Sequence, residues 1–242
     1  MKQRLDHVLV QRGFVPTRSQ AESYIRLGKV TVNKKTITKA GHMIGPDDTV
    51  KLLATEQYVS RAGLKLASVS KTLGLHFKDA VVLDVGSSTG GFTDYALRHG
   101  ATKVIAVDVG TEQLHPSLRG DDRIELHEKT DIRQLRELSA VPAMVVIDVS
   151  FVSLRDILPS VARLVGPNTQ VVAMVKPQFE ARGSTQKHKG VIKNDAMRRK
   201  ILQEFEVWVK NVFVVRDKAD SDVAGEKGNR ERFYLLSKPA KQ

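Results

Sequence analysis

The chain has 242 residues, which is enough for one large α/β domain and a small additional one. Its 39 Lys and Arg residues exceed its 27 Asp and Glu residues, and the net charge of +12 attracts polyanions such as nucleic acid or an anionic membrane surface, unless the basic surface is inert. The absence of cysteine excludes disulfides, thiolate metal sites and cysteine nucleophiles.

The apolar segments of the sequence are short. The first residues are interrupted by charges and lack the apolar centre of a signal peptide. The longest apolar runs, Val141–Ile147 and Val171–Val175, are far shorter than the roughly 20 residues that a membrane helix needs. We therefore expect a soluble protein of the cytoplasm that does not bind membranes.

The first part of the chain predicts two short helices. Leu5, Val8 and Leu9 share one face of a first helix, which ends before the next glycine. Thr17 is placed to cap a second helix that Gly28 closes.

A small hairpin and a positive charge complete this segment. An alternating strand at Val30–Val32 leads into a turn at Asn33–Lys35, and a later strand is predicted at Val50–Leu53. Ten basic and five acidic residues give the first 58 positions a net charge of +5. Such a unit can clamp a phosphate backbone, although it could also merely support a larger domain.

The same segment resembles the RNA-binding domain first seen in small-subunit ribosomal protein four. The resemblance rests on Arg4-Leu5-Asp6, Arg18, Ala21, Ile25, the run Gly28–Asn33, and Asp48. It implies that the paired helices hold structured RNA by its shape and its phosphates. The residues expected to contact RNA are Arg4, Arg18, Arg26, Lys29, Lys34 and Lys35.

From Lys78 onward, strand-like runs alternate with helix-like segments. Strands are predicted at 80–84, 103–108, 124–127, 144–148, 170–175, 212–215 and 233–236, and helices at 91–99, 154–165 and 195–209. This alternation is typical of a parallel, doubly wound α/β sheet, and the last two strands can form an antiparallel edge pair.

A glycine-rich turn follows the first strand of this sheet. The run Asp84–Phe92 reads Asp-Val-Gly-Ser-Ser-Thr-Gly-Gly-Phe, and its glycines allow a tight turn and a close approach to a ligand. It has no lysine, so it is not a phosphate-binding P-loop, and it lacks the Gly-x-Gly-x-x-Gly of dinucleotide sites. The pattern resembles the first motif of S-adenosylmethionine-dependent methyltransferases.

That resemblance implies S-adenosylmethionine as the cofactor. The turn residues expected to bind it are Asp84, Gly86, Ser87, Thr89, Gly90, Gly91 and Phe92. Asp84 is expected near the ammonium and sulfonium groups, Asp108 on the ribose hydroxyls, and Asp131 beside the adenine. Taken singly, Asp84 and Asp131 could instead cap helices, and Asp108 could be an ordinary turn residue.

Further motifs extend the resemblance over nearly the whole chain. They are Ser-Arg-Ala-Gly-x-Lys ending at Lys65, Asp-Val-Ser-Phe starting at Asp148, and Lys-Pro-Gln-Phe-Glu starting at Lys176. Together with the glycine turn they resemble the TlyA (hemolysin A) family of ribosomal RNA 2′-O-methyltransferases. The catalytic domain of that family shares a Lys-Asp-Lys-Glu tetrad with the FtsJ-type RNA methyltransferases, which implies Lys65, Asp148, Lys176 and Glu231 as catalytic residues.

The tetrad suits methyl transfer to a ribose hydroxyl, which hardly ionises at neutral pH. The site must place that oxygen in line with the methyl group and must take its proton or stabilise its charge. Two close lysines favour one neutral amine, whereas the two acids favour the ammonium form. We expect Lys176 nearest the hydroxyl, as a base or as a cationic stabiliser. The alternative is that all four residues are ordinary surface ion pairs.

Two other stretches bear on the site. The family commonly has Asn at position 131 and Ser-Pro-Ile-x-Gly where this chain has Ser221–Gly225, and the second difference concerns the reach of Glu231. A basic cluster either extends the RNA track or forms a solvated face, and comprises Arg182, Lys187, Lys189, Lys193, Arg198, Arg199 and Lys200.

The sequence therefore predicts two domains, residues 1–58 for RNA binding and 59–242 for methyl transfer on a Rossmann-like α/β sheet. The expected function is S-adenosylmethionine-dependent 2′-O-methylation of a cytidine ribose in ribosomal RNA, with the large subunit favoured and no metal involved. The expected partner is ribosomal RNA or a ribosomal subunit, and the oligomeric state is left open. The alternatives are a catalytically inactive, RNA-binding ribosome assembly factor and a membrane-active hemolysin, as the older family name suggests.

Overall fold

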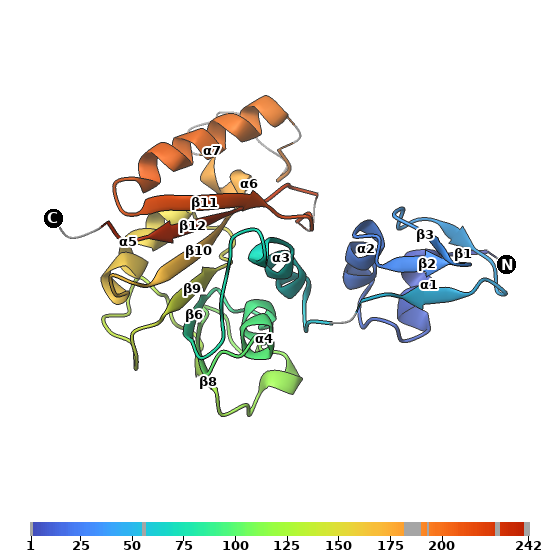
Figure 1. Cartoon of the computed structure of the whole chain (residues 1–242), viewed down its shortest axis with the longest axis horizontal. Helices are drawn as coiled ribbons and strands as arrows, with labels where there is room; N and C mark the ends of the chain where they lie inside the picture. The colour runs from blue at the N-terminus through green and yellow to red at the C-terminus, as the bar shows by residue number, and fades with distance from the viewer. Residues whose placement is uncertain (1, 55–56, 182–189, 193, 226–227, 240–242) are drawn as a thin grey trace. The chain divides into compact units, whose positions relative to one another are not determined.

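The computed structural model describes residues 2–54, 57–181, 190–192, 194–225 and 228–239. The chain divides into two compact units, residues 1–61 and residues 62–242, and each is described by itself (Figure 1). Within the described ranges, every helix is too short or too polar to span a bilayer.

The N-terminal unit combines two helices with two small sheets. Its helices α1 (Leu5–Gln11) and α2 (Arg18–Arg26) pack against each other. Its antiparallel strand pairs join β1 (Gln3–Arg4) to β4 (Met43–Ile44), and β2 (Val30–Val32) to both β3 (Lys35–Thr36) and β5 (Val50–Leu52).

Local sequence signals explain these elements. Thr17 caps α2 by accepting a hydrogen bond from the backbone N–H of Gln20, as predicted. The turn between β2 and β3 has positive φ at Asn33 (50°) and Lys34 (68°), the backbone that a tight hairpin requires.

A buried acid ties α1 to α2. Asp6 is fully buried and accepts hydrogen bonds from Arg4 (Nη2, 2.8 Å) and from Arg18 (Nε, 2.9 Å). Burial alone would raise the pKa of Asp6, but these two guanidinium groups outweigh it and lower the pKa to about 2. Arg4 and Arg18 therefore have a structural role, whether or not they also contact RNA.

The C-terminal unit is built on a seven-stranded sheet in the order β11-β12-β10-β9-β6-β7-β8. Its strands are β6 (Val81–Val85), β7 (Lys103–Val107), β8 (Ile124–His127), β9 (Met144–Ile147), β10 (Gln170–Val175), β11 (Val214–Asp220) and β12 (Arg232–Ser237). The neighbours from β10 to β8 are parallel, while β12 is antiparallel to both β10 and β11. The predicted parallel sheet with an antiparallel edge pair is confirmed.

Helices cover both faces of this sheet (Figure 1). They are α3 (Arg61–Ser70), α4 (Gly91–Arg98), α5 (Leu154–Leu164), the short α6 (Pro177–Glu180) and α7 (Asp195–Val209), with a 3-10 turn at Pro116–Leu118. Successive residues of β12 show the two faces, because side chains alternate along a strand. Phe233 contacts Phe92 of α4, whereas Tyr234 contacts Phe205 of α7.

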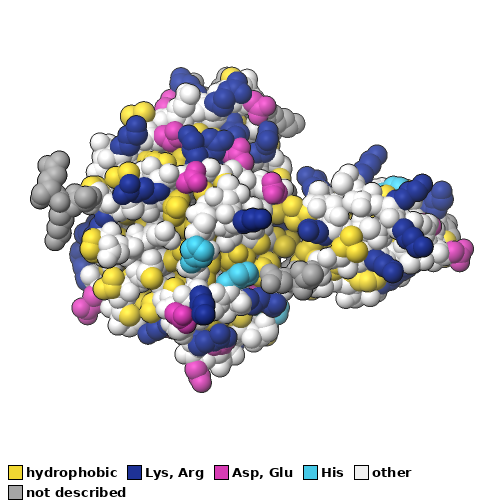
Figure 2. Space-filling model, in the orientation of Figure 1, with side chains coloured by type: hydrophobic (Ala, Val, Ile, Leu, Met, Phe, Trp, Pro, Cys, Tyr) yellow, Lys and Arg dark blue, Asp and Glu magenta, His cyan; other side chains and the backbone are white. Residues whose placement is uncertain are grey.

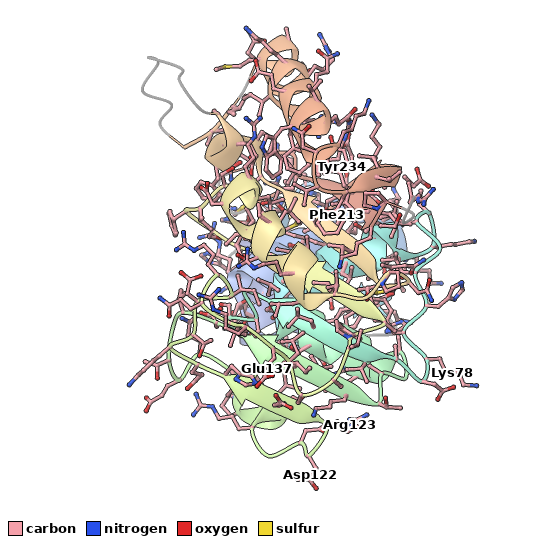
Figure 3. All side chains as sticks on the ribbon, turned by 90° about the vertical axis from the view of Figure 1, so that its left-hand side faces the viewer. Lys78, Asp122, Arg123, Glu137, Phe213 and Tyr234 are labelled. Atoms are coloured by element: carbon pink, nitrogen blue, oxygen red, sulfur yellow. The ribbon has the colours of Figure 1, made fainter. Side chains whose placement is uncertain are left out.

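The core lies between the strands and the helices α5 and α7. Figure 3 shows Phe213 and Tyr234 inside this layer, whereas Lys78, Asp122 and Arg123 lie at the edge of the unit. Phe213 and Tyr234 are both fully buried. This closely packed core gives rigid support to the residues at the ends of the strands.

One predicted strand was placed wrongly. A strand was expected at 212–215, but β11 begins at Val214 and continues to Asp220. Val212 instead closes the end of α7, since its backbone N–H donates to the carbonyl of Val209. The polar residues that follow can still form a strand because β11 is an edge strand with one open side.

Candidate active site

Two ion pairs bring the four predicted catalytic residues to one edge of the sheet. Lys176 Nζ lies 2.6 Å from Asp148 Oδ1, and Lys65 Nζ lies 2.6 Å from Glu231 Oε2. Asp148 and Lys176 follow the adjacent parallel strands β9 and β10, whose carboxyl ends meet. Glu231 directly precedes β12, whose first residue pairs with the last residue of β10, so it reaches the same edge.

Lys176 has a second partner, which the sequence analysis did not single out. Its Nζ donates a hydrogen bond to Ser150 Oγ at 2.7 Å, and only 8% of Lys176 is exposed. Asp148 and Ser150 belong to the same turn after β9. This turn therefore holds the amine from two sides.

Glu231 reaches Lys65 although Ser221–Gly225 departs from the family pattern. The loop folds back on itself, because the backbone N–H of Gly225 donates to the carbonyl of Asn229 at 2.8 Å. Gly225 comes so close to Glu231 that an added Cβ would lie 2.7 Å from Glu231 Oε1. A glycine at this position thus leaves the carboxylate the space that it occupies.

Arg198 is buried, which corrects its expected place in a basic surface cluster. Its Nε donates to the carbonyl of Arg230 at 3.0 Å, and its Nη2 donates to Asp220 Oδ1 at 2.7 Å. The guanidinium therefore binds the backbone beside Glu231 and is shielded from solvent. Of the remaining residues, Arg199 and Lys200 are exposed, while Arg182, Lys187, Lys189 and Lys193 lie outside the described residues.

The glycine turn between β6 and α4 requires glycine at two positions. Gly86 has φ +81°, and a Cβ there would lie 2.7 Å from the carbonyl oxygen of Asp148. Gly90 has φ +87°, and a Cβ there would lie 2.5 Å from the side chain of Leu118. Gly91 follows as the first residue of α4. The backbone can therefore pass close to the turn after β9 and leave open space beside both turns.

Two cavities flank these turns. The larger, of about 480 Å³, is lined by Val85, Gly86, Ser88, Val107, Asp108, Val109, Gln113, Thr130, Asp131, Ile132, Arg133, Val152, Ile157 and the turn residues 148–151. The smaller, of about 130 Å³, is lined by Ala62, Asp84, Gly86, Ser87, Ser88, Thr89, Phe92, Asp148, Ser150 and Lys176. The two cavities are neighbours because they share the lining residues Gly86, Ser88, Asp148 and Ser150, and Lys176 lies at the smaller one.

Polar atoms beside the smaller cavity have unused bonding capacity. Asp84 Oδ2 accepts a hydrogen bond from Thr93 Oγ1 at 2.6 Å, whereas Asp84 Oδ1 and Ser87 Oγ are buried without a hydrogen-bond partner among the described residues. Burial raises the pKa of Asp84 to about 7, and the nearby carboxylates of Asp148 and Asp108 add to the rise. This carboxyl would therefore gain from a cationic ligand.

The acids of the larger cavity differ in how they are held. Asp108 accepts hydrogen bonds from the backbone N–H groups of Ser88 (2.8 Å) and Gly110 (2.7 Å), so it is fixed at the end of β7. Asp131 lies in the turn after β8, and Arg133 donates to both of its oxygens. The hydrogen bonds from this guanidinium lower the pKa of Asp131. Asp131 thus faces the cavity as a paired carboxylate.

An exposed aromatic side chain lies at the larger cavity and was not singled out from the sequence. Phe151 is 91% exposed, has φ +66°, and its ring centroid is 5.3 Å from that of Phe179. A large apolar side chain in a left-handed backbone conformation is a strained arrangement that recurs at functional sites. Phe151 is the last residue of the Asp-Val-Ser-Phe motif, and this motif was the sequence signal that could have identified it.

The residues predicted to bind RNA fall into two groups. Arg4 and Arg18 pair with Asp6, as described above. Arg26, Lys29, Lys34 and Lys35 are exposed, and Arg18 is also exposed although it pairs with Asp6. The positions of these six residues do not test whether they contact RNA, so their role in RNA binding stays a prediction.

Comparison with known proteins identifies the C-terminal unit. The FtsJ-like methyltransferase family matches residues 58–238. The chain belongs to this family. The S4 domain family matches residues 3–50, which lie in the N-terminal unit.

Proteins similar to this chain carry consistent names. The 23S rRNA (cytidine-2′-O)-methyltransferase TlyA of Campylobacter jejuni is 38% identical over 79% of this chain and 76% of its own length. The 16S/23S rRNA (cytidine-2′-O)-methyltransferase TlyA of Mycobacterium tuberculosis is 34% identical over 96% of this chain and 89% of its own. A solved structure of a provisionally named hemolysin from Streptococcus thermophilus is 38% identical, with a TM-score of 0.73 and coverage of 99% and 90%.

The chain is thus a methyltransferase with S-adenosylmethionine as its cofactor, and the residues present fit that molecule. The unpartnered atoms of Asp84 and Ser87 can bind the ammonium and carboxylate of its methionine end. The larger cavity offers Asp108 for the ribose and apolar side chains, such as Val109 and Ile132, for the adenine. These residue roles remain predictions.

Proposed function

We propose that this chain methylates the 2′-hydroxyl of a cytidine ribose in ribosomal RNA, with the large subunit favoured. The carrying observation is the pair of Lys–carboxylate contacts, each 2.6 Å long, at the sheet edge beside the cavities. The S4 match and the names of the two TlyA relatives support RNA as the substrate.

The proposed chemistry centres on Lys176. When bound, S-adenosylmethionine supplies a methyl group on a sulfonium, which leaves as a neutral thioether once the methyl carbon bonds to the ribose oxygen. Lys176 borders the smaller cavity, and we assign its Nζ to contact with the ribose hydroxyl. The hydroxyl proton passes to the Lys176–Asp148 pair, whose amine and carboxylate lie 2.6 Å apart.

The other ion pair has a supporting role in this proposal. Lys65 and Glu231 are almost fully buried, and together they add no net charge to the site. Their amine and carboxylate can orient the ribose beside Lys176. The four charged groups balance, so the site does not repel either a cationic cofactor or an anionic RNA.

We assign RNA capture to the N-terminal unit. Figure 2 shows Lys and Arg side chains spread over the surface of this unit with few acidic ones among them. The exposed Arg26, Lys29, Lys34 and Lys35 supply positive charge for phosphate contacts, which carry affinity without reading sequence. We assign residues 1–58 to the RNA-binding domain and residues 59–242 to the catalytic domain. We place the reaction in the cytoplasm, where ribosomal RNA is available.

Phe151 is proposed to hold the target base. A ribose hydroxyl inside a helix becomes accessible when its nucleotide leaves the stack, and such a base stacks readily on an aromatic ring. Phe151 offers that ring at the larger cavity, and its contact with Phe179 fixes one side of it.

The experiment compares the wild-type chain with Lys176→Ala on ribosomal RNA and on isolated subunits, with the methylated nucleotide located by mass spectrometry. General acid–base or charge stabilisation at this site is worth about 10²- to 10⁴-fold, so methylation by the variant should fall by that factor while S-adenosylmethionine still binds. Lys71→Ala removes an exposed lysine and is the matched control. Near-normal turnover by Lys176→Ala, or methylation of a base by the wild-type chain, contradicts the proposal.

A further inference from the structure

A buried carboxylate beside the site has no part in the proposed chemistry. Glu180 is 1% exposed, and both of its oxygens are engaged. Its Oε2 accepts a hydrogen bond from Ser153 Oγ at 2.7 Å, and its Oε1 accepts one from the backbone N–H of Leu154 at 2.6 Å. Arg155 Nε lies 3.6 Å from Oε2. A buried acid with such short, directed bonds is held in one place.

These bonds join two turns that come from neighbouring strands. Ser153 caps α5 and ends the turn after β9, whereas Glu180 ends α6 and the turn after β10. The two turns are also joined nearer the strands, where Lys176 binds Asp148 and Ser150. The turn after β9 is therefore fixed at both of its ends.

The segment between these two fixed ends carries both strain and function. It contains Phe151 with φ +66°, and its residues 148–152 all line the larger cavity. A strained conformation persists only where the surroundings over-determine it. The hydrogen bonds of Glu180 and of Lys176 supply this restraint from the turn after β10, together with the contact of Phe179 with the Phe151 ring.

The two restraints differ in what the reaction requires of them. In the function proposed above, the Lys176 amine must contact a ribose hydroxyl as well as Asp148 and Ser150, so its bonds to these two residues change during the reaction. Glu180 and Ser153 line neither cavity, so their bonds can stay in place throughout. We propose that Glu180 is a positioning residue that holds the turn 148–153 in shape for the cofactor and for Phe151 while Lys176 is engaged, an inference that rests on the proposed role of Lys176.

The test uses cofactor binding and local hydrogen exchange, neither of which needs RNA. Glu180→Ala should weaken S-adenosylmethionine binding in calorimetry by about tenfold, which is about 1.4 kcal/mol. It should also speed the exchange of the Leu154 amide while the amides of β9 and β10 stay protected. Glu180→Gln keeps an acceptor for Leu154 and can still bond Ser153, so it should stay within about threefold of the wild type. Glu204→Gln, on the exposed side of α7, is the control for loss of a carboxylate.

Two results overturn the inference. One is a folded Glu180→Ala variant with wild-type cofactor affinity and unchanged Leu154 exchange. The other is a lower melting temperature with no change in affinity, which is the behaviour of a purely structural residue. Should Glu180→Ala not fold, Ser153→Ala removes the bond from Ser153 Oγ together with the cap of α5, and an affinity equal to the wild type then refutes the proposal. A different result would refute the proposed function and leave this inference standing: Glu180→Ala binds S-adenosylmethionine more weakly than the wild type, as expected, but the wild type does not methylate RNA.

Discussion

The charge state of Asp84 gives a quantitative prediction for the substitution Asp84→Asn. The pKa of this buried carboxyl is about 7 in the folded chain against 3.8 for the ordinary group, a rise of about 3 units. At about 1.4 kcal/mol for each unit, ionising Asp84 in the folded state costs about 4 kcal/mol more than in the unfolded chain. Burial is the main cause, since Asp84 is fully inaccessible to solvent.

The sign follows from proton counting. Between the two pKa values the folded state keeps the proton and the unfolded state releases it, so the free energy of unfolding falls as the pH rises. The fall begins near pH 4 and levels off above pH 7. In Asp84→Asn this contribution is absent, while Thr93 can still donate to the amide oxygen.

The assay is urea denaturation of both proteins without cofactor at several pH values. From pH 5 to pH 8 the wild type should lose about 3 kcal/mol relative to Asp84→Asn. Equal pH slopes in the two proteins would refute the assignment of a raised pKa to Asp84. A cationic cofactor favours the carboxylate, so calorimetry at pH 6 should also show proton release on binding to the wild type and not to the variant.

Two further substitutions test the geometry of the site. Gly225→Ala places a Cβ 2.7 Å from Glu231 Oε1, so the carboxylate must shift away from Lys65 and kcat should fall about 10- to 100-fold. The control is Gly45→Ala, which should leave kcat unchanged because the nearest atom to the added Cβ is 3.6 Å away. Unchanged kcat in Gly225→Ala would show that Glu231 does not need this position. Phe151→Ala should lower kcat/KM for RNA about 5- to 150-fold, which corresponds to about 1–3 kcal/mol of base stacking, and the exposed Val207→Ala is its control. An effect of equal size in both variants would argue against stacking.

The sheet could be predicted well because its signals are local. The alternating run of β8 and the apolar run of β10 were predicted to the residue. The predicted start of α7 at Asp195 coincides with a cap, since Asn194 accepts a hydrogen bond from the backbone N–H of Met197. β11 was misplaced because its second half is polar, and only pairing with β12 makes those residues a strand. The helix α3 was not predicted, since its residues were read only as part of a motif.

The candidate site was predictable as a set of strand ends but not as a set of contacts. Asp108, Asp148 and Lys176 each follow a strand, so their place at one edge follows from a parallel sheet. The pairing of Lys65 with Glu231 depends on how a helix and a late loop meet, which no local pattern encodes.

Contacts between distant segments also explain why two buried charged residues were not recognised from the sequence. Arg198 sits among basic residues in the sequence, yet it is buried against Asp220 and the backbone of the final loop. Glu180 ends a recognised motif, yet its bonds to residues 153 and 154 depend on the packing of two separate turns. Charge patterns in a sequence show which residues are present, not which of them find partners inside.

The reversed direction of β12 makes the site depend on the residue that precedes this strand. Parallel strands deliver their last residues to the reactive edge, whereas β12 delivers the residue just before its first, Glu231. Lys65 therefore depends on a partner that lies 166 positions later in the sequence. A chain that stops before Glu231 would lack one of the two ion pairs, so under the proposed function it would have no complete site.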